Sequence, residues 1–391
     1  MRTMKFNLFA YGFRPFFLFA GLFALLAAPA WVAMVRAGAT PFAGLPGQIW
    51  HGHEMLYGFV IAALAGFLLT AVPSWTGARG FGGWPLAAVA CTWLLGRIAL
   101  SLVTVLPLWV CVAIDLAFLP ALAVLLAPPL VRSRNRNTPL LAVLVALWVT
   151  DAAVWVGILG RDYPLASHSL RAGIDVMLLV LTLIGGRIVP SFTSSTLARQ
   201  GRRPALSKPE WLERAVIAAM AAVLLIDLWR PDGAAAGWVA ALAALLQAAR
   251  LAGWRSLRTR GEPILWVLHV GYAWLPLGLA LKAAWLLAGV PWAAYWLHAL
   301  TMGAFATMIL AVMTRAALGH TGRPIVAGGA LAGAYALITL AAAVRVFGPV
   351  LYPSYLAVLG ASAALWSAAF AIYLLIYAPI LILPRADGKP G

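Results

Sequence analysis

Charged residues and cysteines are scarce in this sequence. Only 10% of its 391 residues are Asp, Glu, Lys or Arg, whereas a soluble domain carries about 25%. With 64% hydrophobic residues and a mean hydropathy of +0.94, the chain has too little polar surface for a soluble enzyme, a disordered protein or a coiled coil. The two cysteines, Cys91 and Cys111, form no Cys-x-x-Cys-His motif, which excludes covalently attached haem. The composition therefore predicts an all-α integral membrane protein.

Acidic residues are scarcer still, with 11 Asp and Glu against 28 Lys and Arg and a net charge of +17. A basic nucleic-acid-binding domain gathers its charge on one polar face. Here the basic residues lie almost wholly in short segments between apolar runs. We therefore expect membrane lipid around the chain and no nucleic-acid partner.

The apolar runs predict a single membrane domain over residues 1–391. A helix needs about 20 mostly apolar residues to cross the hydrocarbon core. Windowed hydropathy gives twelve such spans, at residues 15–35, 51–72, 84–103, 107–130, 139–160, 168–190, 211–229, 236–253, 264–288, 293–314, 326–346 and 355–380.

The positive-inside rule predicts that both termini are cytoplasmic. With that orientation 20 of the 28 basic residues fall in cytoplasmic segments, including Arg2, Lys5 and Arg203. Three lie within spans, namely Arg97, Arg187 and Lys282. Five are assigned to the periplasmic side: Arg36, Arg161, Arg171, Arg230 and Arg345.

Spacing between prolines and histidines indicates an internal repeat. Pro15, Pro139 and Pro263 each open a span, and each is 124 residues from the next. The starts of spans 2, 6 and 10 each carry a histidine followed by glycine five residues later, in the pairs His53 and Gly58, His168 and Gly173, and His298 and Gly303. We predict three parallel four-helix repeats, at about 1–138, 139–262 and 263–391.

Four of the six histidines are expected at one membrane level, near the periplasmic ends of these spans: His51, His53, His168 and His298. Helix-borne imidazoles are common ligands of haem iron and other metals inside bundles. His51 and His53 lie about 200° apart on a helix, which implies two sites or one ligand and one structural histidine. We take His53 and His298 as the first axial haem ligands, and His51 and His168 as ligands of a second haem or of copper.

Further residues join this predicted site. Met55 and Met302 follow His51 and His298 by four residues, so each pair shares a helix face, and thioether sulfur favours copper or haem iron. Arg171 lies on the same side and could pair with haem propionates. A histidine at a membrane interface also has a purely structural interpretation.

The remaining polar residues leave alternatives open. His269 is either a separate ligand or a bundle histidine with satisfied hydrogen bonds, and His320 is expected in a solvated loop. Ionisable residues inside spans either line a wet path or form buried ion pairs that fix helix register. Glu54, next to His53, could orient the imidazole. The other such residues are Asp115, Asp151, Asp175, Asp227, Arg97, Arg187 and Lys282.

Four sequence blocks closely resemble the NnrS family. They are Tyr11-Gly-Phe-Arg-Pro-Phe-Phe17, Trp50-His-Gly-His-Glu-Met55, Gly185-Gly-Arg-Ile-Val-Pro-Ser-Phe-Thr193, and the set His298-Ala-Leu-Thr-Met-Gly303, Met313-Thr-Arg315 and Gly319-His-Thr-Gly322. The resemblance covers nearly the whole chain. It implies a twelve-span protein of the bacterial inner membrane, associated with haem and copper, with denitrification and with the response to nitric oxide and nitrosative stress.

The predicted helix plan also resembles that of haem-copper oxidases and nitric oxide reductases. Two departures weaken that likeness as a guide to chemistry. Span 7 contains no histidine, and the His-x-His pair lies on span 2 rather than span 10.

Residues and resemblance together lead to one main hypothesis. The protein would hold non-covalent haem b, with copper as a further cofactor, and would bind or process nitric oxide near the periplasmic side. If it is an enzyme, it would be an oxidoreductase with a quinol or another redox partner. The alternatives are a secondary transporter of a small solute, which usually binds its substrate near the bilayer midplane, and an electron-transfer subunit.

Overall fold

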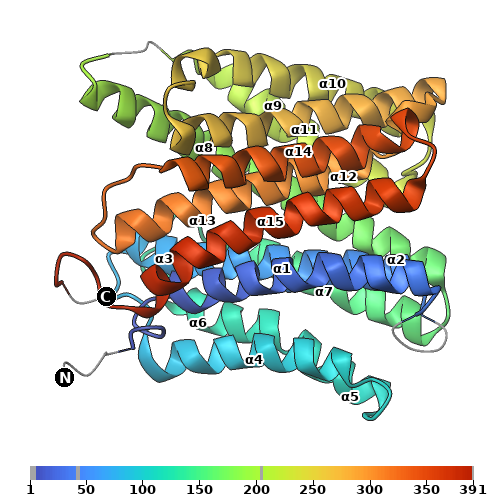
Figure 1. The fold of residues 1–391 in the computed structure, drawn as a ribbon, viewed down its shortest axis with the longest axis horizontal. Coiled ribbons are helices and arrows are strands. Elements are labelled where there is room, and N and C mark those ends of the chain that lie inside the picture. The colour runs from blue at the N-terminus through green and yellow to red at the C-terminus, as the bar shows by residue number, and fades with distance from the viewer. Residues whose placement is uncertain (1–5, 41–44, 203–205, 390–391) are drawn as a thin grey trace. The chain divides into compact units, whose positions relative to one another are not determined.

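A computed structural model describes residues 6–40, 45–202 and 206–389. Arg2, Lys5 and Arg203, which contribute to the predicted charge asymmetry, lie outside the described residues. Every regular element in the described part of the chain is a helix (Figure 1). This confirms the all-α membrane class predicted from composition.

The chain forms two compact units. Unit 1 comprises residues 1–173, 313–324 and 370–391, and unit 2 comprises residues 174–312 and 325–369. The helices of unit 1 begin with α1 (Phe13–Ala37), α2 (Gly47–His53), the π-helix η1 (Glu54–Val60), α3 (Ile61–Thr76) and α4 (Gly83–Ser101). They continue with α5 (Leu108–Leu116), α6 (Phe118–Arg132), α7 (Leu140–Leu159) and the start of α8 (Tyr163–Arg199).

Unit 2 contains the rest of α8 and most of the later helices. These are α9 (Glu210–Trp229), α10 (Ala234–Ala252), the 3₁₀ turns η2 (Ser256–Thr259) and η3 (Pro291–Ala293), α11 (Pro263–Ala288), α12 (Trp296–His298) and the π-helix η4 (Ala299–Ala306). The ends of α13 (Thr307–His320) and α15 (Tyr355–Ile382) return to unit 1, whereas α14 (Gly329–Leu351) lies wholly in unit 2.

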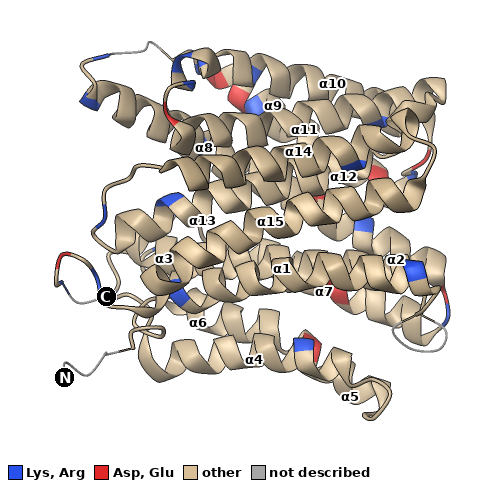
Figure 2. Cartoon of the chain, in the orientation of Figure 1, with Lys and Arg blue, Asp and Glu red and all other residues tan. Residues whose placement is uncertain are grey.

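Eleven helical segments within the described residues, some of them made of several consecutive helices, are long and apolar enough to cross a membrane. They coincide with eleven of the twelve predicted spans. The predicted span 211–229 is present as α9, which has the length of a span but carries Glu210, Glu213, Arg214 and Asp227. Figure 2 shows that most of each helix is free of Lys, Arg, Asp and Glu, as hydrocarbon surroundings require.

The three repeated prolines lie at helix starts, as predicted. Pro15 is in the first turn of α1, Pro139 is the N-cap of α7 and Pro263 is the first residue of α11. The missing N–H of proline costs little there, because the first backbone N–H groups of a helix have no partner inside it. The threefold repeat as a whole stays a prediction.

The first and last described segments meet in unit 1. Arg14 is fully buried, and its guanidinium donates hydrogen bonds to the carbonyl oxygens of Leu381 (2.9 Å) and Leu383 (2.7 Å) at the end of α15. The backbone N–H of Asn7 bonds the carbonyl oxygen of Ile382 at 2.8 Å. A cation at a helix C-terminus is favourable because it faces the negative end of the helix dipole. Arg14 therefore connects α1 to α15 across more than 360 residues of sequence.

Candidate metal centre

His53 is the last residue of α2 and directly precedes the π-helix η1. π-helices are rare, and many of them occur at functional sites. Because η1 departs from the usual helical hydrogen bonding, backbone groups in it can find other partners. The carbonyl oxygen of Gly58 accepts a hydrogen bond from Trp93 Nε1 at 3.1 Å. The packing of α4 against η1 therefore helps to hold the segment that follows His53.

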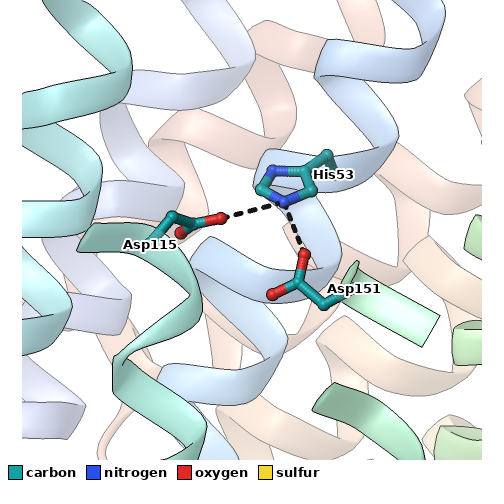
Figure 3. A group of neighbouring side chains, drawn as sticks. All are labelled: His53, Asp115 and Asp151. Carbon is teal, nitrogen blue, oxygen red and sulfur yellow. Dashed lines mark hydrogen bonds and ion pairs between the residues drawn. The ribbon is translucent and has the colours of Figure 1, made fainter. Parts of the chain in front are cut away.

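Two buried carboxylates face the imidazole of His53. Its Nε2 lies 2.9 Å from Asp151 Oδ1, on α7, and 3.3 Å from Asp115 Oδ2, on α5. Figure 3 shows both carboxylates pointing at the same ring nitrogen. The three donor atoms lie within 4.8 Å of one another, which is close enough for a single metal ion to contact all of them.

A second layer of side chains holds these groups in place. On the other side of the ring, His53 Nδ1 lies 3.1 Å from Glu54 Oε1, and this same oxygen accepts a hydrogen bond from Arg97 Nη1 at 2.5 Å. Arg97 Nη2 also pairs with Asp115, and Trp155 Nε1 donates to Asp115 Oδ2 at 2.9 Å. Glu54 therefore contacts the imidazole of His53, and its role in orienting the ring stays a prediction.

The cluster is buried and carries surplus negative charge. His53, Glu54, Arg97, Asp115 and Asp151 are each at most 8% exposed. Three carboxylates meet one guanidinium, which leaves a formal charge of −2 when the imidazole is neutral. Buried carboxylates are costly unless a positive charge compensates them. A bound divalent cation would bring the formal charge of the cluster to zero.

Glycines allow the helices to approach this closely. A Cβ on Gly96 of α4 would lie 3.3 Å from the backbone of Asp115. A Cβ on Gly173 of α8 would lie 2.6 Å from the hydroxyl of Tyr57, which itself donates to Thr150 Oγ1 at 3.0 Å. Larger residues at these positions would push α5 away from α4, or η1 away from α8.

His298 has a similar local setting in unit 2. It is the last residue of α12 and directly precedes the second π-helix, η4. Gly303 lies in η4, as Gly58 lies in η1, and a Cβ on Gly303 would meet the indole of Trp274 at 2.5 Å. The Sδ of Met302, also in η4, accepts a contact from Ser362 Oγ at 3.8 Å.

The other predicted ligands lie outside the donor cluster of His53. His51 is half-buried, and its ring stacks on Trp31 with centroids 4.7 Å apart. His168 and Arg171 lie half-buried near the start of α8, and Met55 lies half-buried in η1. Their roles in cofactor binding stay predictions, as do those of His298 and Met302.

The two remaining histidines have structural partners. His269 is 3% exposed; its Nε2 lies 2.9 Å from Thr193 Oγ1 and its Nδ1 lies 2.9 Å from Ser256 Oγ. This agrees with the interpretation as a satisfied bundle histidine. His320 was expected in a solvated loop, and that expectation is wrong. It ends α13 and is half-buried against the rings of Tyr11 and Phe13, at centroid distances of 6.0 and 5.7 Å.

Sequence reasoning identified the ionisable residues of the cluster singly and did not combine them. Asp115, Asp151 and Arg97 were recognised as charges inside spans, but they come from three different helices. A usable signal was present, because buried charges in membranes seldom occur without partners. The missing information was which helices are neighbours.

Comparison with protein families places the chain in a known family. The family model described as NnrS protein matches residues 7–385, nearly the whole chain. A comparison with curated proteins found no match. The NnrS family is associated with haem and copper, so a buried cluster of metal-binding donors is in keeping with it. The chain belongs to the NnrS family and is a membrane protein related to the nitric oxide response.

Proposed function

We propose that this protein is a metalloprotein of the nitric oxide response, and that the His53 cluster holds a metal ion at which nitric oxide binds or is processed. The observation that carries this proposal is the convergence of three buried donor atoms of unit 1, which lie within 4.8 Å of one another: His53 Nε2, Asp115 Oδ2 and Asp151 Oδ1. Family membership supplies the link to nitric oxide.

The donor set favours a divalent ion of intermediate hardness. One imidazole nitrogen and two carboxylate oxygens suit Cu²⁺, Fe²⁺ or Zn²⁺, whereas Cu⁺ prefers sulfur. Copper in its divalent state therefore fits both the residues and the association of the family. A redox-active ion bound here would supply a coordination position for a diatomic ligand and would exchange single electrons.

The surrounding residues prepare His53 for this role. With a metal bound, Glu54 would accept the Nδ1–H of the imidazole, and the lone pair of Nε2 would face the ion beside Asp115 and Asp151. Arg97 offsets part of the carboxylate charge and fixes Asp115, while Trp155 donates to the second oxygen of the same carboxylate. The rings of Trp155 and Tyr57 cover the imidazole, at centroid distances of 4.9 and 5.0 Å.

His53 is less suited to axial ligation of haem. A haem iron needs an imidazole nitrogen that faces open space for a flat macrocycle, whereas both nitrogens of His53 face buried carboxylates. We therefore propose haem b ligation for His298, with His51 and His168 as further ligands. Met55 and Met302 would be axial or copper ligands, and Arg171 would pair with a propionate.

Topology and partners complete the proposal. The charge asymmetry supports an inner-membrane protein with cytoplasmic termini, so that His53 lies near the periplasmic side. Alkaline phosphatase fused after residue 389 should be inactive, and the same enzyme inserted at Gly38, between α1 and α2, should be active. The reverse result would overturn this orientation. A quinol or another redox partner would supply electrons.

Metal analysis tests the proposed centre directly. The full chain is purified in detergent from cells grown with added copper, and copper, iron and zinc are measured by mass spectrometry. We expect about one ion per chain to depend on the cluster, and the double variant Asp115→Asn, Asp151→Asn to lose most of it. Anaerobic addition of nitric oxide should change the electron paramagnetic resonance spectrum of the unmodified protein and not that of the variant.

Glu210→Gln is the matched control, because it also removes a carboxylate but from an exposed pair with Arg214. It should keep both the metal and the response to nitric oxide. Circular dichroism and size-exclusion chromatography show whether each variant is folded. A folded double variant with the metal content of the unmodified protein would refute the proposed centre. Haem content, measured in parallel on His298→Ala, tests the haem proposal separately.

A further inference from the structure

Arg345, in unit 2, is a buried cation without a carboxylate partner. The predicted topology counted it on the periplasmic side, at the end of span 326–346, but α14 continues to Leu351, so the residue lies inside the helix and is 6% exposed. Within the described residues it forms no ion pair, and its Nη1 has no hydrogen-bond partner. A buried guanidinium in this state lacks the compensation that such charges ordinarily have.

The neighbours of Arg345 are two tyrosines. Its Nη2 donates a hydrogen bond to the hydroxyl of Tyr355 at 3.0 Å. The guanidinium carbon lies 5.0 Å from the ring centroid of Tyr295 and 5.3 Å from that of Tyr355. Ring faces attract a cation, but more weakly than a paired carboxylate does. They position the guanidinium and leave its charge unneutralised.

Another buried cation of this unit, Lys282, does not provide a carboxylate for Arg345. Lys282 pairs with Asp227, and the carboxylate of Asp227 is therefore already matched by a positive charge. Arg97 in unit 1 gives a direct contrast. It lies 248 residues before Arg345, the same spacing that separates Pro15 from Pro263, yet its guanidinium bonds both Glu54 and Asp115.

From this contrast we infer that Arg345, with Tyr295 and Tyr355, forms a binding site for a small planar oxyanion or carboxylate taken from solution. The planar fork of an arginine matches the two oxygens of such an anion, and Nη1 is available to donate to one of them. The hydroxyl hydrogen of Tyr355 supplies a second donor, because its oxygen already accepts from Arg345.

The position of the site allows an anion to reach it. Arg345 is six residues from the end of α14, which is about 9 Å along the helix. Tyr355 is 38% exposed and Tyr295 is half-buried, so the tyrosines connect the guanidinium to the surface of the unit. This site is separate from the His53 cluster and does not depend on a metal there; the ring of Tyr295 lies 6.4 Å from that of His298, for which haem ligation is proposed.

Calorimetry and thermal unfolding of the full chain in zwitterionic detergent test the inference. Sodium nitrite and sodium acetate are the probes, with sodium chloride used to hold the ionic strength constant. We expect saturable binding and a raised melting temperature with either probe. Arg345→Met should weaken binding at least about tenfold, the effect of losing a hydrogen bond to a charged group. It should fold at least as well as the unmodified protein, because it removes a buried charge.

Arg230→Met is the matched control. Arg230 also lies 5.0 Å from an indole ring, that of Trp229, but it is exposed at the end of α9. Its loss should leave anion binding unchanged. Tyr355→Phe keeps the ring and removes the hydroxyl, so it should also weaken binding and would carry the test if Arg345→Met did not fold.

Three results would overturn the inference. One is the absence of saturable binding of either probe, and another is equal affinity in the unmodified protein and a folded Arg345→Met. The third is stabilisation by vesicles of anionic phosphatidylglycerol but not by nitrite or acetate, since the site would then bind lipid headgroups.

Discussion

The surplus negative charge of the His53 cluster predicts opposite effects for two neighbouring substitutions. Arg97→Gln removes the guanidinium that bonds Glu54 and Asp115, and it takes the formal charge from −2 to −3. Asp151→Asn removes one of the three carboxylates and takes the charge to −1. Asp151→Asn keeps the size of the side chain and the positions of its polar atoms, whereas Gln is shorter than Arg97 and loses the contacts with Glu54 and Asp115 together with the charge.

The expected magnitudes differ by several kilocalories. Breaking a buried, hydrogen-bonded ion pair by removing one partner costs about 3–5 kcal/mol, and Arg97 has two such partners. Asp151→Asn relieves repulsion between carboxylates, so in metal-free protein it should change the free energy of unfolding by less than about 1 kcal/mol or raise it. Arg97→Gln should therefore be the less stable of the two by at least about 2 kcal/mol.

Reversible unfolding in mixed micelles, followed by far-ultraviolet circular dichroism, measures these differences. The experiment is done first with a chelator and then with a divalent metal. Metal at 100 times its Kd should stabilise the unmodified protein by about 2.7 kcal/mol, and Asp151→Asn by much less. If Asp151→Asn without metal is as unstable as Arg97→Gln, the charge reasoning is wrong.

Two further predictions concern other parts of the chain. Gly186→Ala should lower the free energy of unfolding by about 1–3 kcal/mol, the usual cost of overpacking, because a Cβ would lie 1.8 Å from the Nη2 atom of the buried Arg250. The guanidinium of Arg250 is held by hydrogen bonds to Glu213, Thr182 and Tyr272 and cannot easily move aside. Gly333→Ala, where nothing lies within 4 Å, is the control and should not destabilise α14 in the same thermal scans. Hydrogen bonds from Arg385, at 2.9 and 2.7 Å, hold the pKa of Asp387 well below its usual range. A depressed folded pKa means that this contact is present above the unfolded pKa of about 3.9 and is lost as pH falls through the lower folded value. Hydrogen exchange at residues 385–389, corrected for intrinsic rates, should therefore rise only in strong acid, whereas Asp387→Asn should show fast exchange already at pH 6.

Much of the fold followed from the sequence, because hydrocarbon surroundings impose simple rules. Apolar runs of about 20 residues must be helical there, and eleven of the twelve predicted spans appear as such helices. Pro15, Pro139 and Pro263 marked helix starts, where the missing N–H costs little, although prolines such as Pro73 and Pro276 lie inside helices. The charges of α9 show where hydropathy alone is an incomplete guide, because Glu213 and Asp227 pair with Arg250 and Lys282 on neighbouring helices, and Glu210 and Arg214 form an exposed pair.

The site was less accessible to sequence reasoning. His53 was identified from its position in a repeated pattern, but its ligand partners come from α5 and α7, and no spacing rule connects residues 53, 115 and 151. Arg345 shows the same limit from another direction. The predicted span 326–346 put Arg345 at its periplasmic end, whereas α14 continues for five residues beyond 346 and the residue is buried.

The direction in which His53 and His298 point depends on the π-helices that follow them. An α-helix turns by about 100° per residue, so one residue more or less between a histidine and the rest of its span rotates the imidazole by that angle. The span from Gly47 to Thr76 contains the wider winding of η1 between His53 and α3. Deleting a single residue from 54–60 would let this segment wind as an ordinary α-helix. The same imidazole, with the same neighbours in sequence, would then face away from Asp115 and Asp151, which makes chain length within η1 as much a determinant of the metal centre as the ligands themselves.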